Sequence, residues 1–220
     1  MKKLVPFAVL FFVLSAVAGH ARESGLIITV PKAKSTASAT GKTILLRSVT
    51  DNRKFEDRPQ SANIPSLAAT LARTTPRQKS LAVARARDGY GKARHNIFMA
   101  PSQPVESVVR QVVANALTAK GYTVVSKVAQ AGKNALVADV SIEQFWGYIN
   151  IAGGAWGGGR MTMEGEMTTV LTLNDGGKVF RLPVSARASH LFRLMTGGHW
   201  SQMFGKLLSD YLNNFAQIRF

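Results

Sequence analysis

Three runs in the second half of the chain alternate apolar and polar residues, and this regular period of two restricts the fold more than any other feature. Successive side chains of a β-strand point to opposite faces, so each run predicts a strand with one apolar face. Such strands, when consecutive, are typical of an antiparallel sheet with one face toward solvent. Run by run, the residues that share the apolar face are Leu136, Ala138, Val140, Ile142 and Trp146; Met161, Met163, Met167, Thr169, Leu171 and Leu173; and Phe180, Leu182, Val184, Ala186, Ala188 and Phe192.

The polar faces and the connections of these runs fit a hairpin arrangement. Residues 174–177 (NDGG) predict a tight hairpin turn, and residues 153–159 (GGAWGGG) predict a longer connection. On the outer face, Glu164 and Glu166 are expected to pair with Arg181 and Arg187.

Two stretches carry apolar residues at helical spacing. In residues 102–122 we expect Ser102 as the N-cap, Pro104 in the first turn and Gly121 just past the end. A second helix should follow Gly198 and bury a heavier stripe of large side chains. The sequence therefore predicts an α+β fold, a two-layer sandwich of a mainly antiparallel sheet with two amphipathic helices on one face.

The first residues are typical of a signal peptide. Lys2 and Lys3 precede an apolar run, and small residues follow, so residues 1–21 are expected to be a leader cleaved after Ala18 or Ala21. Residues 22–41 are expected to be a mobile linker with a short strand at 26–30, and residues 42–220 a single domain. After the leader no apolar run is long enough to cross a bilayer.

The segment between the linker and the first helix is less regular. We expect a strand at 42–50, a turn at Asp51–Asn52–Arg53, a short helix at 64–73 and a basic turn at 74–79. An edge strand at 80–87 and a turn at 88–91 should follow, which leaves His95 in a basic loop.

Most of the positive charge lies in this segment. The chain has a net charge of +16, and between Lys32 and Arg94 there are fourteen Lys and Arg against four Asp and Glu. A surface this basic attracts anions such as lipid head groups or acidic polysaccharide, while nucleic acid is not expected as the partner of an exported protein. Trp156, in the glycine-rich connection, is a second candidate contact. The candidate surface for an anion or an envelope protein partner comprises Arg73, Arg77, Lys79, Arg85, Arg87 and Trp156.

Residue types that carry chemistry are sparse. Cysteine is absent, which excludes disulfides, thiol catalysis and lipid attachment to cysteine. A metal site from His190 and His199 is conceivable, but core or capping roles are favoured because no helical histidine pair or nearby carboxylate supports it. Glu164 and Glu166 could act as paired acids, but a solvated salt-bridge face explains them better. We therefore expect no catalytic, cofactor or metal site.

Several segments resemble the YajG family of small bacterial envelope lipoproteins. They are residues 49–53 (VTDNR), 88–91 (DGYG), 108–124 (VVRQVVANALTAKGYTV) and 136–148 (LVADVSIEQFWGY). The resemblance spans most of the chain after the leader and implies a non-enzymatic envelope protein that acts by binding or scaffolding. Family members usually carry a lipobox cysteine, which this chain lacks, so a periplasmic protein, soluble or peripheral to the outer membrane, is expected. The alternative is an accessory factor of a surface machine, such as flagellar or outer-membrane assembly; the oligomeric state stays open.

Overall fold

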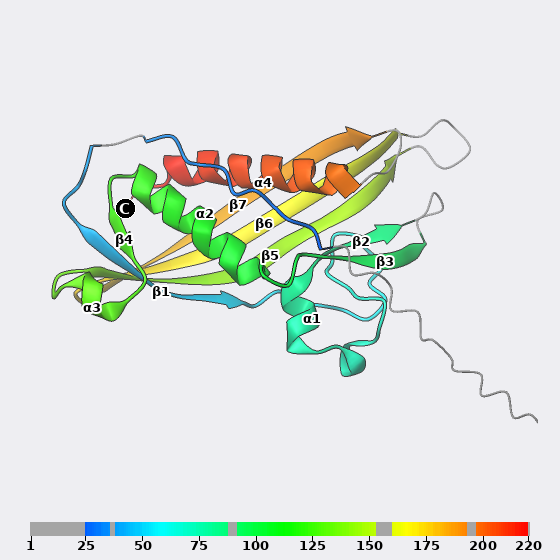
Figure 1. Cartoon of the computed structure of the whole chain (residues 1–220), viewed down its shortest axis with the longest axis horizontal. Helices are drawn as coiled ribbons and strands as arrows, with labels where there is room; N and C mark the ends of the chain where they lie inside the picture. The colour runs from blue at the N-terminus through cyan, green and yellow to red at the C-terminus, as the bar shows by residue number, and fades with distance from the viewer. Residues whose placement is uncertain (1–24, 36–37, 88–91, 153–159, 193–196, 220) are drawn as a thin grey trace, which may run out of the picture.

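The computed structural model describes residues 25–35, 38–87, 92–152, 160–192 and 197–219 (Figure 1). The predicted leader, the turn at 88–91 and the glycine-rich stretch that carries Trp156 lie outside these ranges. In chain order the elements are β1 (Thr43–Asp51), the 3-10 helix η1 (Leu71–Arg73), α1 (Pro76–Leu81), β2 (Ala82–Arg87), β3 (Ala93–Phe98), α2 (Val105–Ala119), β4 (Thr123–Val125), α3 (Val128–Ala131), β5 (Leu136–Ala152), β6 (Arg160–Asp175), β7 (Lys178–Phe192) and α4 (Gly197–Gln217).

The long strand β5 lies at the centre of a seven-stranded sheet. Along one edge it pairs antiparallel with β6, which in turn pairs antiparallel with β7, so the predicted meander is confirmed. The other edge of β5 is shared by two parallel strands, with β1 along its first half and β2 at Gly147. β4 then joins β1 in parallel and β3 joins β2 antiparallel, so the described sheet is mixed.

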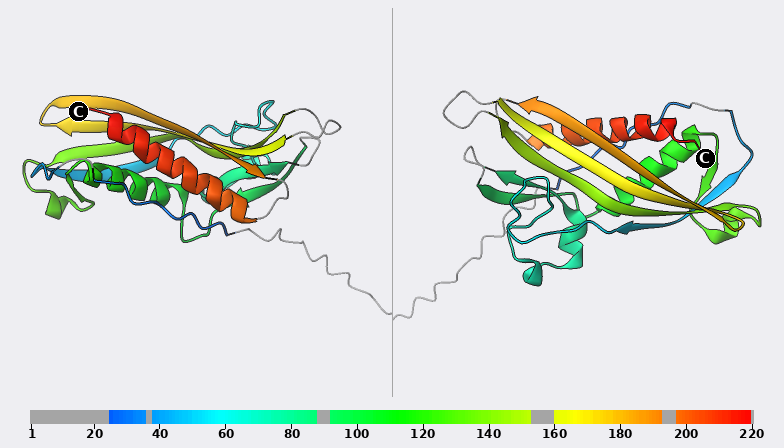
Figure 2. Two further views of the ribbon diagram at one scale, coloured as in Figure 1. Left: turned by 90° about the horizontal axis from the view of Figure 1, so that it is seen from above. Right: turned by 180° about the vertical axis from the view of Figure 1, so that it is seen from behind.

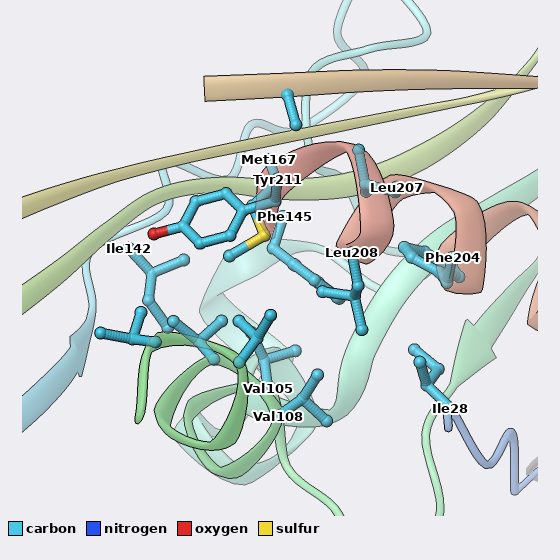
Figure 3. Packing of buried hydrophobic residues seen from close by; sticks show 14 of the residues in the cluster. Ile28, Val105, Val108, Ile142, Phe145, Met167, Phe204, Leu207, Leu208 and Tyr211 are labelled. Atoms are coloured by element: carbon cyan, nitrogen blue, oxygen red, sulfur yellow. The ribbon is translucent and has the colours of Figure 1, made fainter. Parts of the chain in front are cut away.

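Both long helices lie on the same face of this sheet, as the views in Figure 2 show. All seven apolar positions of the α2 stripe are buried, from Val105 to Leu117. The α4 stripe, which includes Phe204, Leu208 and Tyr211, meets them and the sheet in one core (Figure 3). The predicted two-layer α+β sandwich with two amphipathic helices on one face is confirmed.

A β-bulge in β5 changes which residues face the helices. The register with β6 shifts between Ile142 and Gln144, so the alternation slips by one residue. Ile142 before the bulge and Phe145 after it both lie in the helix-side core. Trp146 was predicted on the helix side, which is wrong: it is fully buried in a second cluster with Leu67 and Phe55. Sequence alternation alone could not reveal the extra residue.

The middle of the chain differs from the prediction in several elements. The short helix expected at 64–73 reduces to the three residues of η1, while α1 forms where a basic turn was expected. Strand β2 lies between β3 and β5 instead of at an edge, because its small side chains can be buried. His95 lies in β3, not in a loop. Helix α2 begins at Val105 with Pro104 as its N-cap, so the expected N-cap at Ser102 is wrong.

The described residues of the predicted linker contact the rest of the fold. Leu26 forms a single parallel bridge with Met99, so no full strand forms there. The side-chain amide of Gln103 bonds both the N–H and the carbonyl of Ile28, and Asn115 donates to the carbonyl of Pro31. The segment is therefore tied to both ends of α2.

Candidate partner-binding surface

The predicted basic residues belong to one lobe, residues 52–100, which holds η1, α1, β2 and β3 at one end of the sheet (Figure 1). This basic lobe contains ten Lys and Arg against three Asp and Glu. Helix α1 is short, but a reciprocal capping box between Thr75 and Gln78 fixes its start, with Pro76 in the first position. The capping box places Arg77 and Lys79 on a defined turn in front of β2.

Arg53 joins the basic lobe to the sheet. Its buried guanidinium donates to the carbonyls of Ala82 and Phe145 at 2.7 and 2.9 Å and to that of Lys79 at 2.7 Å. It also binds both oxygens of Asp51, at the end of β1. The Asp-x-Arg segment predicted as a turn is therefore a structural connection between β1, β5, α1 and β2.

Two carboxylates in or beside the basic lobe form contacts within the fold. Asp51 is engaged with Arg53, and Asp57 accepts the backbone N–H of Leu71 at 2.8 Å to hold the start of η1. Arg73 and Arg77 are both exposed, although Arg77 also donates to the carbonyl of Pro101. Arg73 and Arg77 thus face solvent, while Asp51 and Asp57 bind groups of the fold itself.

Only part of the predicted surface is outward-facing. Lys79 is half-buried and lies 6.0 Å from the centre of the Phe55 ring, a cation–π geometry. Arg85 is half-buried in β2, opposite Asn96. The side chain of Arg87 and all of Trp156 lie outside what the structure describes. Arg94, exposed on β3, is a further basic residue of this lobe and was not part of the predicted candidate surface.

A separate polar cluster lies on the sheet face away from the helices. The Tyr148 hydroxyl lies 2.7 Å from Glu164 and 3.1 Å from Glu166, and Asn150 donates to Glu164 at 2.8 Å. Burial, followed by these hydrogen bonds and negative charges, raises the pKa of Tyr148. Arg187 reaches Glu166 at 3.5 Å, which confirms that predicted pair, whereas Arg181 lies opposite Thr172.

This outer-face cluster lines a cavity of about 200 Å³, together with Lys206 and Ser189. The sequence predicted the two glutamates on this face but not Tyr148, because the bulge in β5 turns this tyrosine to their face. The Tyr148 hydroxyl is uncharged, so it leaves the negative charges of Glu164 and Glu166 in place. We call this cluster the acidic patch, and Arg187 is its positively charged partner.

The structure also brings His190 and His199 together. Nε2 of His190, on β7, lies 3.0 Å from Nδ1 of His199, in the first turn of α4. Both rings are half-buried. The sequence could suggest this pair but could not establish that the two rings meet.

A second hollow lies between the two long helices. It has a volume of about 540 Å³ and is bordered by Lys32, Lys34 and Lys120, with Leu212 and Ala216 among its apolar lining residues. Lys120 donates to the carbonyls of Ala216 and Ile218 at the end of α4, and burial lowers its pKa.

The described residues lack two further kinds of feature. No helix there is both long and apolar enough to span a membrane. Nor do three or more His, Cys, Asp or Glu side chains of those residues gather as ligands for a metal ion.

Comparisons with known proteins give little beyond distant structural similarity. No family model matches the sequence, and no curated protein matches it. One similar crystal structure is that of protein XCC0632 from Xanthomonas campestris, of family DUF330, with 11% identity, a TM-score of 0.45, and coverage of 86% of this chain and 90% of that chain. Another is an uncharacterized protein with 13% identity, a TM-score of 0.38, and coverage of 80% of this chain and 97% of that chain. Neither description names a ligand or a reaction.

Proposed function

We propose that this protein is a non-enzymatic periplasmic protein of the YajG type, which acts by binding or scaffolding in the bacterial envelope. The basic lobe is its docking surface, and phosphate groups of envelope lipids are its targets. The observation that carries this proposal is the excess of positive charge in the lobe, which holds ten Lys and Arg against three Asp and Glu. Arg73 and Arg77 are exposed, whereas Asp51 and Asp57 are engaged within the fold.

The chemistry of the exposed groups suits phosphates. A guanidinium is always charged and presents a planar fork of donors that matches phosphate oxygens. Near an anionic membrane each Lys or Arg contributes about 1 kcal/mol, so several are needed for stable attachment. Arg94 on β3 adds a further exposed charge to the same lobe.

The separation of the polar clusters supports binding over catalysis. The acidic patch of Tyr148, Glu164 and Glu166 lies on the outer face of the sheet, and the histidine pair lies at the start of α4, on the helix side. The two clusters therefore lie on opposite faces of the sheet. A binding role needs only the exposed lobe.

Vesicle flotation tests this proposal. The exported protein is mixed with phosphatidylglycerol vesicles or with phosphatidylcholine vesicles, and the floated fraction is measured against salt. The test variant is Arg73→Ala/Arg77→Ala. The control is Lys127→Ala/Lys133→Ala, which removes the same charge from exposed residues around α3, at the other end of the molecule (Figure 1). We expect the test variant to bind anionic vesicles about thirtyfold more weakly, from two contacts of about 1 kcal/mol each, and the control to bind as the parent does.

Equal loss in both variants would show that only net charge matters and would contradict the docking surface. Absence of vesicle binding by the parent would contradict the lipid target. In that case, cross-linking in intact envelopes would test the accessory role, through a protein partner that the parent captures and the Arg73→Ala/Arg77→Ala variant does not.

A further inference from the structure

We infer that His190 and His199 together bind a divalent transition-metal ion of the kind that prefers imidazole, such as Zn²⁺, Ni²⁺ or Cu²⁺. The two rings come from different elements, yet Nε2 of His190 and Nδ1 of His199 are 3.0 Å apart. Their ring centroids are 5.1 Å apart and the ring planes are inclined by 35°.

Both histidines are held by regular structure. His190 lies opposite Met163 in the β6–β7 ladder, beside Ser189, whose carbonyl lies 3.4 Å from Nζ of Lys206 on α4. His199 precedes Trp200, which is buried in the core. Ligands carried on packed elements need little ordering when a metal binds. Because the rings are only half-buried, an ion from solvent can reach them.

The distance between the nitrogens is close to that of a metal site. Metal–nitrogen bonds of about 2.0–2.1 Å in a tetrahedral arrangement separate two ligand nitrogens by about 3.3 Å. The rings must therefore move apart by a few tenths of an ångström and turn their lone pairs toward a common point. One of the two nitrogens carries the proton of the present hydrogen bond. On metal binding, that proton transfers through solvent to the other nitrogen of the same ring, so no charge is left over.

The ligand type selects the class of metal. Imidazole suits Zn²⁺, Ni²⁺ and Cu²⁺, whereas Mg²⁺ and Ca²⁺ prefer oxygen ligands. Among the described residues no third His, Asp, Glu or Cys completes the set, so water fills the remaining positions. The positive end of the α4 dipole weakens the binding of any cation here. Among imidazole-binding divalent ions, Cu²⁺ has the strongest affinity and is therefore expected to bind most tightly.

Calorimetric titration of the exported protein with Cu²⁺, Ni²⁺ and Zn²⁺ tests this site. All proteins carry His20→Gln, because cleavage after Ala18 would leave His20 in the exported protein. The test variants are His190→Gln and His199→Gln, and the matched control is His95→Gln, an exposed histidine on β3. We expect one ion per chain, with the strongest binding for Cu²⁺. Each test substitution should weaken binding by more than about tenfold, since even outer-shell partners of metal-bound histidines contribute about 10–100-fold.

Saturable binding that survives in His190→Gln/His199→Gln, or its absence from the parent, would overturn the site. Electron paramagnetic resonance of the Cu²⁺-loaded parent covers the case in which the glutamine variants do not fold. Coupling to two imidazole nitrogens is expected, and coupling to none or to one would also overturn it.

Discussion

The guanidinium of Arg53 and the carboxylate of Asp51 form two parallel hydrogen bonds, of 2.8 Å to Oδ1 and 2.7 Å to Oδ2. The Arg53 side chain is fully buried and that of Asp51 is 12% exposed. The carbonyls of Lys79, Ala82 and Phe145 accept from the same guanidinium, so this pair adds to the contacts that hold the basic lobe against β5.

Replacing Arg53 with Met should be strongly destabilising. The change leaves the Asp51 carboxylate without its charged partner and the carbonyls of Ala82 and Phe145 without this donor. The free energy of unfolding should therefore fall by about 3–5 kcal/mol. Urea unfolding followed by circular dichroism measures the loss. The matched control is Arg47→Met, whose partner Asp139 and own side chain are far more exposed, and its effect should be much smaller. Similar losses in both variants would contradict the role given to Arg53.

A buried hydroxyl pair couples the sheet to α4. Thr169 and Tyr211 lie in the core with their oxygens 2.7 Å apart. Tyr211→Phe should cost about 1–3 kcal/mol, because it leaves the Thr169 hydroxyl buried without that partner. Adding Thr169→Val should recover part of the loss, since both polar groups are then removed. A double-mutant cycle from chemical denaturation checks this, and simple additivity would count against the coupling.

Two glycines should respond in opposite directions to alanine. A Cβ on Gly147 would lie 2.7 Å from Cζ3 of Trp200 and 2.9 Å from Cε of Met203, so Gly147→Ala should destabilise by about 1–3 kcal/mol through overpacking. Gly205, in α4, has nothing within 4 Å of such a Cβ. Gly205→Ala should stabilise by about 0.5–1 kcal/mol through helix propensity. Thermal melts of both variants give the signs, and a stabilising Gly147→Ala would contradict the close approach of α4 to β5.

Alkaline pH should weaken the fold through Tyr148. Burial and the neighbouring Glu164 and Glu166 raise the pKa of its hydroxyl above the unfolded value of about 10. Above that pH the unfolded chain loses this proton before the folded one does, so stability that is complete below about pH 10 is lost as the pH rises. In Tyr148→Phe the decline should be shallower, as denaturant midpoints at increasing pH would reveal. Parallel pH profiles for the two proteins would refute the effect.

The regular alternation of the last three strands and the spacing of α2 were enough to predict the layers of the fold. Both the alternation in the strands and the helical spacing in α2 place the apolar residues on one face, and that face must be buried. The position of Trp146 was not predictable in this way, because the bulge after Ile142 inserts a residue without any composition signal. Strand β3 was missed because His95 and Asn96 are polar and the strand is short.

The candidate surface was predicted only in part, for a similar reason. The density of Lys and Arg in the sequence located the basic lobe. Which of these side chains are exposed depends on how the lobe packs, and the charge pattern carries no information about packing. Lys79 stacks over Phe55, and Arg85 lies in an interior strand. The meeting of His190 with His199 depends on how α4 lies against β7, a tertiary relation that local sequence does not encode.

The placement of β1 inside the sheet bears on how the chain is made. Its partners β4 and β5 come far later, and the carbonyl of Phe145 that Arg53 needs is 92 residues downstream. At synthesis rates of about 5–20 residues per second, the apolar strand would wait roughly 5–20 s for them. During most of that interval Ile44, Leu45 and Leu46 lack β5, and until residues 105–125 are made they also lack α2 and β4, so we expect the nascent chain to expose this apolar strand to a holding chaperone.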